Sequence, residues 1–184
     1  MLSPSILKQL VTIVGEDRLL LAAEDFQHYG LDRTTVWQAN PCAVVLPGSI
    51  KEVQQIVLLA KELNLAIVPS GGRTGLSGGA VAKDGEIVVA LDRLNNIQEF
   101  NPLDRTVTVG AGMITENLQN FAVDQGLFYP VDFASTGSSQ IGGNIATNAG
   151  GINVIRYGMT RQWVAGLTVV TGAGDVLELN QGLM

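Results

Sequence analysis

The chain has 184 residues, of which 46% are hydrophobic and 15% are charged, and it carries a net charge of −6 at pH 7. This length is enough for one domain with a hydrophobic core or for two small lobes. The acidic balance argues against nucleic acid as a partner, and no apolar run approaches the roughly 18 residues that a membrane span requires. The mean hydropathy of +0.27 predicts exposed apolar surface, which favours self-association or contact with a missing segment.

One cysteine and one histidine limit the chemistry that the chain can perform. Cys42 lies beside an apolar run and is typical of a small buried hydrophobe, and alone it cannot form an internal disulfide or a cysteine-based metal cluster. His28 has no second histidine or cysteine with which to share a metal, so we expect a surface histidine. The N-terminal residues lack a basic segment followed by an apolar one, which predicts a cytoplasmic protein without a signal peptide.

The N-terminal part of the chain has the pattern of two helices followed by a β-α-β unit. An N-cap serine at position 3 and a proline at position 4 begin a helix that ends at Gly15, and a second helix is expected over residues 22–29. Strands are predicted at residues 43–46 and 65–68. Between them, Ser49 and Glu52 predict a capping box for a helix that reaches about residue 63, with Asn64 at its end.

Further strands and one helix are predicted in the rest of the chain. Residues 86–91 form a strand, and residues 97–100 and 106–109 form a hairpin. Gly110 and Gly112 lead into a helix that ends at Gly126, and residues 166–171 and 176–179 form a second hairpin. The chain stops at residues 182–184 without a closing helix, so we expect the C-terminal truncation of a longer protein.

Two glycine-rich stretches interrupt these elements, PSGGRTGLSGGA at residues 69–80 and TGSSQIGGNIATNAGG at residues 136–151. Glycine loses the most entropy on folding, so its concentration in two places favours ligand binding over the alternative, which is tight turns and close helix packing. The first stretch follows the carboxyl end of a strand, where ligands of α/β proteins usually bind. The second contains no lysine or arginine, so we expect backbone dipoles to hold an anion there.

Common nucleotide and hydrolase motifs are absent or incomplete. The first glycine-rich stretch lacks the lysine of a Walker A loop, and no G-x-S-x-G elbow is present. Gly110 and Gly112 begin a dinucleotide fingerprint, and Asp132 follows about twenty residues later, as a ribose-binding acid would. Thr115 replaces the third glycine, however, and no second parallel strand follows, so this interpretation is disfavoured.

Both glycine-rich stretches resemble known cofactor-binding segments. Residues 69–79 are similar to the first pyrophosphate-binding loop of the FAD-linked oxidases whose fold is named for p-cresol methylhydroxylase and vanillyl-alcohol oxidase. Residues 141–151, followed by RYG at 156–158, resemble the second FAD-binding segment of that family. The sequences of these two motifs most resemble those of the D-2-hydroxyglutarate dehydrogenase and D-lactate dehydrogenase branch of the family. The resemblance covers residues 24–184.

The resemblance implies an α+β fold in which FAD lies between two small α+β subdomains. We expect residues 1–40 to form an N-terminal helical segment and residues 41–184 to form an incomplete FAD-binding domain that lacks its substrate domain. Some members attach the flavin to a histidine where this chain has Arg73, so we expect noncovalent FAD. Arg73 would either neutralise the pyrophosphate or be a solvated loop residue.

The resemblance also implies the residues that bind the cofactor. Backbone groups of Gly71, Gly72, Thr74 and Gly75 would hold the pyrophosphate. The flavin and its ribityl chain would be lined by Gly142, Gly143, Asn144, Thr147 and Asn148. The expected cofactor-binding residues are Pro69, Ser70, Gly71, Gly72, Arg73, Thr74, Gly75, Gly79, Pro130, Asp132, Thr136, Gly137, Ser138, Gly142, Gly143, Asn144, Thr147, Asn148 and Gly150.

The expected function is that of the FAD-binding portion of a D-2-hydroxyacid dehydrogenase. The parent protein would pass a hydride from a small 2-hydroxy acid to the flavin, while its catalytic histidines and metal belong to the missing domain, so no catalytic residue is expected here. The alternative is a non-enzymatic folded fragment or interaction module that does not retain FAD. The presence of flavin absorbance in the purified chain would distinguish the two hypotheses.

Overall fold

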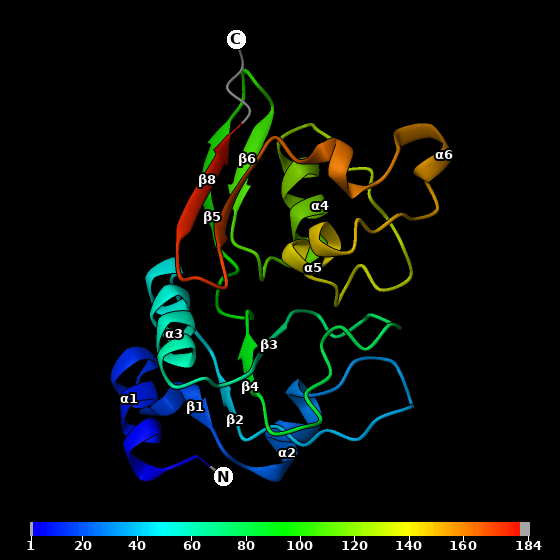
Figure 1. Ribbon diagram of the computed structural model, residues 1–184. Coiled ribbons are helices and arrows are strands. Elements are labelled where there is room, and N and C mark those ends of the chain that lie inside the picture. The colour runs from blue at the N-terminus through cyan, green and yellow to red at the C-terminus, as the bar shows by residue number, and fades with distance from the viewer. Residues whose placement is uncertain (1, 181–184) are drawn as a thin grey trace.

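Two α+β subdomains follow one another along the chain in the computed structural model, which describes residues 2–180 (Figure 1). The first subdomain contains the N-terminal helices and a four-stranded sheet, and the second contains two hairpins with the helices between them. Residues 182–184, on which the expectation of truncation depended, lie outside the described residues. None of the helices in residues 2–180 has the length and apolar character needed to cross a membrane.

The sheet of the first subdomain has the strand order β1-β2-β4-β3. Strands β2, β4 and β3 are parallel, and β1 pairs antiparallel with β2. The parallel core agrees with the predicted β-α-β unit, although β4 lies between the two strands of that unit. The strands are β1 (Leu19–Leu20), β2 (Ala43–Val45), β3 (Ile67–Ser70) and β4 (Ile87–Ala90).

Helices cover both faces of this sheet: α1 (Pro4–Val14) and α3 (Ile50–Glu62) on one and α2 (Ala23–Tyr29) on the other. A single 3-10 turn, η1 (Glu16–Arg18), joins α1 to β1. On the first face, Leu10 of α1 and Ile56 of α3 pack against Val45 and Ile87 of the sheet. Residues before position 40 therefore share a hydrophobic core with residues after it.

The predicted N-terminal caps of α1 and α3 form, with one difference in the capping box, whereas the C-cap of α3 is Leu63 and not Asn64. The Ser3 side chain accepts the Ile6 N–H, and the Ser49 hydroxyl accepts the Glu52 N–H at 3.2 Å. The Glu52 carboxylate accepts the Gly48 N–H at 2.7 Å instead of the N–H of Ser49, and it also pairs with the Arg18 guanidinium of η1 at 3.3 Å.

The second subdomain packs its helices against the first of its two hairpins. Met113, Leu118 and Ile141 form its buried cluster, with Val107 and Val109 of the hairpin against them. The elements are β5 (Ile97–Asn101), β6 (Thr106–Val109), α4 (Thr115–Asp124), α5 (Ile141–Ala146), α6 (Val154–Tyr157), η2 (Thr160–Trp163), β7 (Gly166–Val170) and β8 (Val176–Asn180). Both predicted hairpins, β5–β6 and β7–β8, are confirmed.

Helix α5 was not expected, because it contains the Gly142-Gly143 pair of the second glycine-rich stretch. A Cβ added to Gly142 would lie 2.8 Å from the Cβ of Ala111, so this glycine permits close helix packing. A Cβ added to Gly143 would have no neighbour within 4 Å. Gly142 is therefore explained by close helix packing, which was the alternative to ligand binding. At Gly143, space for a ligand remains.

Close backbone contacts join the two subdomains. The turn between β7 and β8 reaches α3, where the Gln54 amide donates to the Gly174 carbonyl at 2.8 Å. In the segment that links β4 to β5, the carbonyl oxygen of Leu94 accepts the Gly112 N–H at 2.8 Å, and a Cβ on either Gly110 or Gly112 would overlap this segment. Close contact between these two backbone segments thus accounts for glycine at positions 110 and 112. A dinucleotide fingerprint is not needed to explain them.

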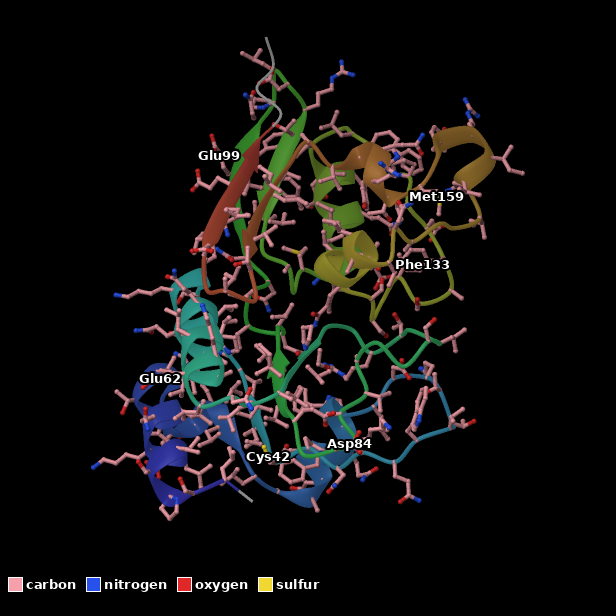
Figure 2. All side chains as sticks on the ribbon, viewed as in Figure 1. Cys42, Glu62, Asp84, Glu99, Phe133 and Met159 are labelled. Carbon is pink, nitrogen blue, oxygen red and sulfur yellow. The ribbon has the colours of Figure 1, made fainter. Side chains whose placement is uncertain are left out.

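Cys42 directly precedes β2 in the first subdomain (Figure 2). It is partly buried against the core that α1 and α3 cover, and burial raises the pKa of its thiol. The interpretation of Cys42 as a small packed side chain therefore agrees with its surroundings.

Candidate functional site

A cavity of about 540 Å³ lies between the two subdomains. Three segments of the chain form most of its walls: the end of α2 with the residues after it, the first glycine-rich stretch, and the residues that precede α5. Asp92 and Ile114 complete the walls. Five of the expected cofactor-binding residues line the cavity, namely Gly72, Arg73, Thr74, Gly137 and Ser138. The residues that the sequence did not indicate are Gln27, His28, Leu31, Asp32, Arg33, Asp92, Ile114 and Gln140.

The two glycine-rich stretches meet at Gly72. A Cβ added to Gly72 would overlap the carbonyl oxygen of Ser138 and lie 2.7 Å from the Cα of Ser139. Real side chains do not tolerate such distances to backbone atoms, so only glycine allows the two stretches to touch here. Gly72 therefore fixes the position of one stretch against the other at the wall of the cavity.

Arg73 is held by its own subdomain. Its guanidinium forms two hydrogen bonds with the Asp92 carboxylate, at 3.0 and 3.2 Å, donates to the Gly71 carbonyl at 2.7 Å, and lies 4.9 Å from the centre of the Tyr29 ring. Its side chain is 16% exposed. The expectation that Arg73 is a solvated loop residue is therefore wrong. The Asp92 carboxylate already compensates the positive charge of the Arg73 guanidinium.

The segment after α2 forms hydrogen bonds with the first glycine-rich stretch. The Asp32 carboxylate accepts the N–H groups of Thr34 and Gly78, both at 2.8 Å, and the Arg33 N–H donates to the Gly75 carbonyl at 2.9 Å. The Trp37 ring lies so close to Gly78 that an added Cβ would overlap it. Asp32 and Trp37 thus determine the shape of the stretch without belonging to it.

Two side chains are exposed at the cavity, His28 from the end of α2 and Arg33 from the segment after it. His28 is a surface histidine, as expected, and its ring contacts Tyr29 edge to face at 4.6 Å between centroids. Within residues 2–180, the Arg33 guanidinium has neither a carboxylate nor a hydrogen-bond acceptor as a partner. Arg33 is therefore available to an anion in the cavity.

A buried polar network holds the residues that precede α5. The Thr115 and Ser139 hydroxyl groups are hydrogen-bonded at 2.7 Å, and the Asn144 amide donates to the Thr115 hydroxyl at 2.7 Å. All three residues are buried. The Asn144 side chain was expected to line the flavin, but it is committed to this network because Thr115 at the start of α4 faces it.

Gln140 differs from its buried neighbours because its amide oxygen has no partner. The residue is 4% exposed, and Oε1 accepts no hydrogen bond. A Cβ added to Gly71 would lie 3.4 Å from this oxygen, so Gln140 reaches the first glycine-rich stretch across the cavity wall. A buried acceptor without a donor in the chain is rare in native proteins, and an ordered water is a common partner for such a group.

Several expected residues have structural partners outside the cavity walls. The Ser70 hydroxyl donates to the Tyr29 carbonyl at 3.0 Å, and the Thr147 hydroxyl donates to the Gly143 carbonyl at 3.0 Å. The Asn148 amide oxygen accepts the Arg161 N–H at 3.0 Å. The other expected residues that do not line the cavity are Pro69, Gly71, Gly75, Gly79, Pro130, Asp132, Thr136, Gly142, Gly143, Asn144 and Gly150. A cofactor role for all of these residues stays a prediction.

The arrangement fits FAD, the cofactor that the resemblance implies. Backbone groups of both glycine-rich stretches and the Arg33 guanidinium suit a pyrophosphate, and the partnerless Gln140 oxygen suits a hydroxyl or amino donor. No group of three or more metal-ligating side chains lies together within residues 2–180. The metal expected in another domain stays a prediction.

Comparison with known proteins identifies the family. The model of the FAD binding domain matches residues 41–180. A D-2-hydroxyglutarate dehydrogenase from Xanthomonas citri pv. viticola is 61% identical over 167 residues, which are 91% of this chain and 35% of that protein. The chain thus spans between 35% and 40% of the length of the first curated relatives that it matches.

Solved structures confirm the expected fold. An alkyldihydroxyacetonephosphate synthase superposes with a TM-score of 0.89 at 23% identity, over 100% of this chain and 36% of that chain. A p-cresol methylhydroxylase with bound substrate superposes with a TM-score of 0.77 at 19% identity, over 95% of this chain and 34% of that chain. The arrangement of two α+β subdomains is therefore of the p-cresol methylhydroxylase type, and the chain belongs to the FAD binding domain family.

Proposed function

We propose that this chain is the FAD-binding portion of a flavin-dependent D-2-hydroxyacid dehydrogenase of the D-2-hydroxyglutarate or D-lactate type. The match to the FAD binding domain and the 61% identity to a D-2-hydroxyglutarate dehydrogenase support this function. The observation that carries it is the contact of the two glycine-rich stretches at Gly72 and Ser138, on the wall of a cavity between the subdomains.

In this proposal the chain binds and orients the cofactor. The backbone of Gly71, Gly72, Thr74 and Gly75 would hold the pyrophosphate, and Arg33 would supply positive charge there, because Asp92 already pairs with Arg73. Gly143 offers open space for the flavin side. Bound FAD supplies the redox chemistry, acceptance of a hydride from the hydroxy acid, and the protein supplies the positioning.

Substrate chemistry belongs, in the same proposal, to the part of the relatives that this chain does not span. Oxidation of a 2-hydroxy acid requires a base for the hydroxyl proton and a site for the carboxylate. The only histidine, His28, lies at the wall formed by the end of α2. The resemblance to the hydroxyacid dehydrogenases is what places the base, the carboxylate site and the metal in the remainder of the whole protein.

Self-association and a cytoplasmic location complete the proposal. Apolar side chains are exposed on both subdomains, including Leu76 at 77% and Leu103 at 92% of their surface. The side chain of Ile155 in α6 is 99% exposed. Such surface favours contact with another copy or with a further domain.

Titration of the purified chain with FAD tests the proposal. We expect saturable quenching of flavin fluorescence at one FAD per chain, with modest affinity, because one wall of the flavin site belongs to the remainder of the whole protein. The absence of saturable binding would contradict the proposal and favour a non-enzymatic interaction module.

A dye-reduction assay then separates FAD binding from substrate oxidation. The chain is incubated with FAD, an artificial electron acceptor, zinc or manganese, and either D-2-hydroxyglutarate or D-lactate. We expect no turnover, because no base for the substrate hydroxyl is assigned to this chain. Turnover that disappears in His28→Ala would instead place the base at His28.

A further inference from the structure

Four consecutive backbone N–H groups in the first glycine-rich stretch, those of residues 72–75, donate to no acceptor within residues 2–180. Three of these residues, Gly72, Arg73 and Thr74, line the cavity. Arg73 has a φ of +57°, and a left-handed residue within a turn brings neighbouring N–H groups onto one concave side of the backbone. Concave runs of N–H groups bind anions, so this wall of the cavity suits a phosphate group.

Arg33 is the charged residue beside this run of N–H groups. Its own N–H donates to the Gly75 carbonyl at 2.9 Å, which fixes the Arg33 backbone next to residues 72–75. Its side chain is exposed at the cavity, and no carboxylate in the described part of the chain pairs with it. An exposed guanidinium at this place can reach a ligand in the cavity.

The other charged side chains of the cavity wall already have partners. Asp92 pairs with Arg73, and the Asp32 carboxylate accepts the N–H groups of Thr34 and Gly78. Of the two arginines that line the cavity, Arg33 is thus the one whose charge is not compensated. This matters in a chain with a net charge of −6, because an acidic protein repels an anionic ligand unless positive charge is placed locally.

Arg33 also lies outside the part of the chain that the FAD binding domain model matches, residues 41–180. The glycine motifs give no indication of it, and folding alone brings it to the first glycine-rich stretch. Any contribution of Arg33 to binding is therefore additional to the backbone groups that the matched domain supplies.

We propose that Arg33 is a binding residue for the diphosphate of FAD and makes the affinity for the cofactor depend on charge. The inference rests on the proposed function. The N–H groups of residues 72–75 would donate to phosphate oxygens, and the Arg33 guanidinium would compensate their negative charge. The planar guanidinium presents two parallel N–H donors that match two oxygens of a phosphate, which an ammonium group cannot do.

Arg33→Gln tests this role by titration of the chain with FAD. The dissociation constant should increase about tenfold at low salt, because one charge-assisted contact is lost. The difference from the unmodified chain should shrink to less than about threefold at about 0.5 M salt, because ions screen exposed charges. Arg33→Lys keeps the charge and should recover part of the affinity. The melting temperature without FAD should stay unchanged in both variants, because the guanidinium has no partner to lose.

Arg105→Gln is the matched control. Arg105 is exposed in the turn between β5 and β6 and is not among the residues that line the cavity, so this variant removes the same net charge elsewhere. Its dissociation constant for FAD should equal that of the unmodified chain. An equal loss of affinity in Arg105→Gln and Arg33→Gln would show that only the net charge of the chain matters, which would overturn the inference.

Two further outcomes would overturn the inference while the proposed function stands. One is an unchanged dissociation constant for FAD in Arg33→Gln at low salt. The other is a loss of affinity that persists at about 0.5 M salt, is not recovered by Arg33→Lys and accompanies a lower melting temperature, which would assign Arg33 a structural role. Failure of the unmodified chain to bind FAD would instead remove the proposed function itself, and the inference with it.

Discussion

The carboxylate of Asp32 accepts the backbone N–H of Gly78 at 2.8 Å, across 46 positions of the sequence. Its second oxygen accepts the Thr34 N–H at the same distance, so one side chain ties the segment after α2 to the first glycine-rich stretch. Gly78 has a φ of +77°, a conformation that side chains rarely adopt, and the Trp37 ring covers it. The stretch is therefore held in shape by residues that do not themselves belong to the glycine motif.

Asp32→Ala should loosen the first glycine-rich stretch. Loss of two hydrogen bonds to a carboxylate should lower the free energy of unfolding by about 2–3 kcal/mol and weaken FAD binding about tenfold or more. Asp32→Asn, which keeps one acceptor oxygen, should lie between this variant and the unmodified chain. Urea denaturation and FAD titration measure both effects, with Asp104→Ala in the exposed β5–β6 turn as the control. Unchanged FAD affinity in Asp32→Ala would show that the stretch holds its shape without Asp32.

Two glycines in the β7–β8 turn offer a matched pair that tests the contact between the subdomains. Gly174 has a φ of +91°, and an added Cβ would overlap the Leu58 side chain of α3, whereas Gly172 has no neighbour within 4 Å. Gly174→Ala should therefore destabilise the chain by about 2 kcal/mol or more, and Gly172→Ala by less than about 0.5 kcal/mol. Equal denaturation midpoints would refute a role of this turn in joining the subdomains.

Gly143→Ala tests the expectation that α5 borders the flavin. The position lies inside a helix and faces open space, so alanine should raise the free energy of unfolding by about 0.5–1 kcal/mol without FAD. The larger Gly143→Val should occupy space that the cofactor needs and weaken FAD binding. Full affinity for FAD in Gly143→Val would place the flavin elsewhere.

Any FAD bound to the chain should be noncovalent. Arg73 stands where some family members carry the histidine that links the flavin, and its guanidinium is engaged by Asp92 and Gly71. Precipitation with acid should release all of the yellow colour into the supernatant. Flavin that stays with the washed pellet would reveal a covalent attachment at another residue.

The Tyr129 phenol should make the stability of the chain sensitive to alkaline pH. Burial raises its pKa to about 12, whereas an unfolded tyrosine titrates near about 10. Between these two pH values the folded chain keeps the proton of the Tyr129 hydroxyl, whereas the unfolded chain loses it. The free energy of unfolding is therefore intact below about pH 10 and falls as the pH rises toward about 12. The loss should reach at most about 2 kcal/mol, because the side chain is partly exposed to solvent.

Tyr129→Phe is the variant that isolates this effect. It keeps the ring that contacts Trp163, at 6.5 Å between centroids, and removes the titrating hydroxyl. Urea midpoints measured across this pH range should fall less steeply in the variant than in the unmodified chain. Parallel pH profiles of the two chains would mean that Tyr129 ionises freely in the folded state.

The sequence by itself determined the elements that depend on near neighbours. The first helix begins after Ser3 and ends at Gly15, and the β5–β6 hairpin closes around its turn, as their residues predict. Caps, turns and apolar periodicity involve contacts only a few residues apart, so a single sequence carries them. The glycine motifs likewise identified the family and the fold.

Only the tertiary structure decided how the cavity wall is built. The residues from Gln27 to Arg33 belong to no motif, yet folding brings them against the first glycine-rich stretch. Arg73 offered two interpretations until its pairing with Asp92, 19 positions away, was visible. Helix α5 escaped prediction because glycine disfavours helices and α5 contains two adjacent glycines, and its packing against Ala111 overrides that preference. Contacts between distant segments form only when the chain has folded. The same holds for the Gln140 oxygen, which these contacts leave without a partner.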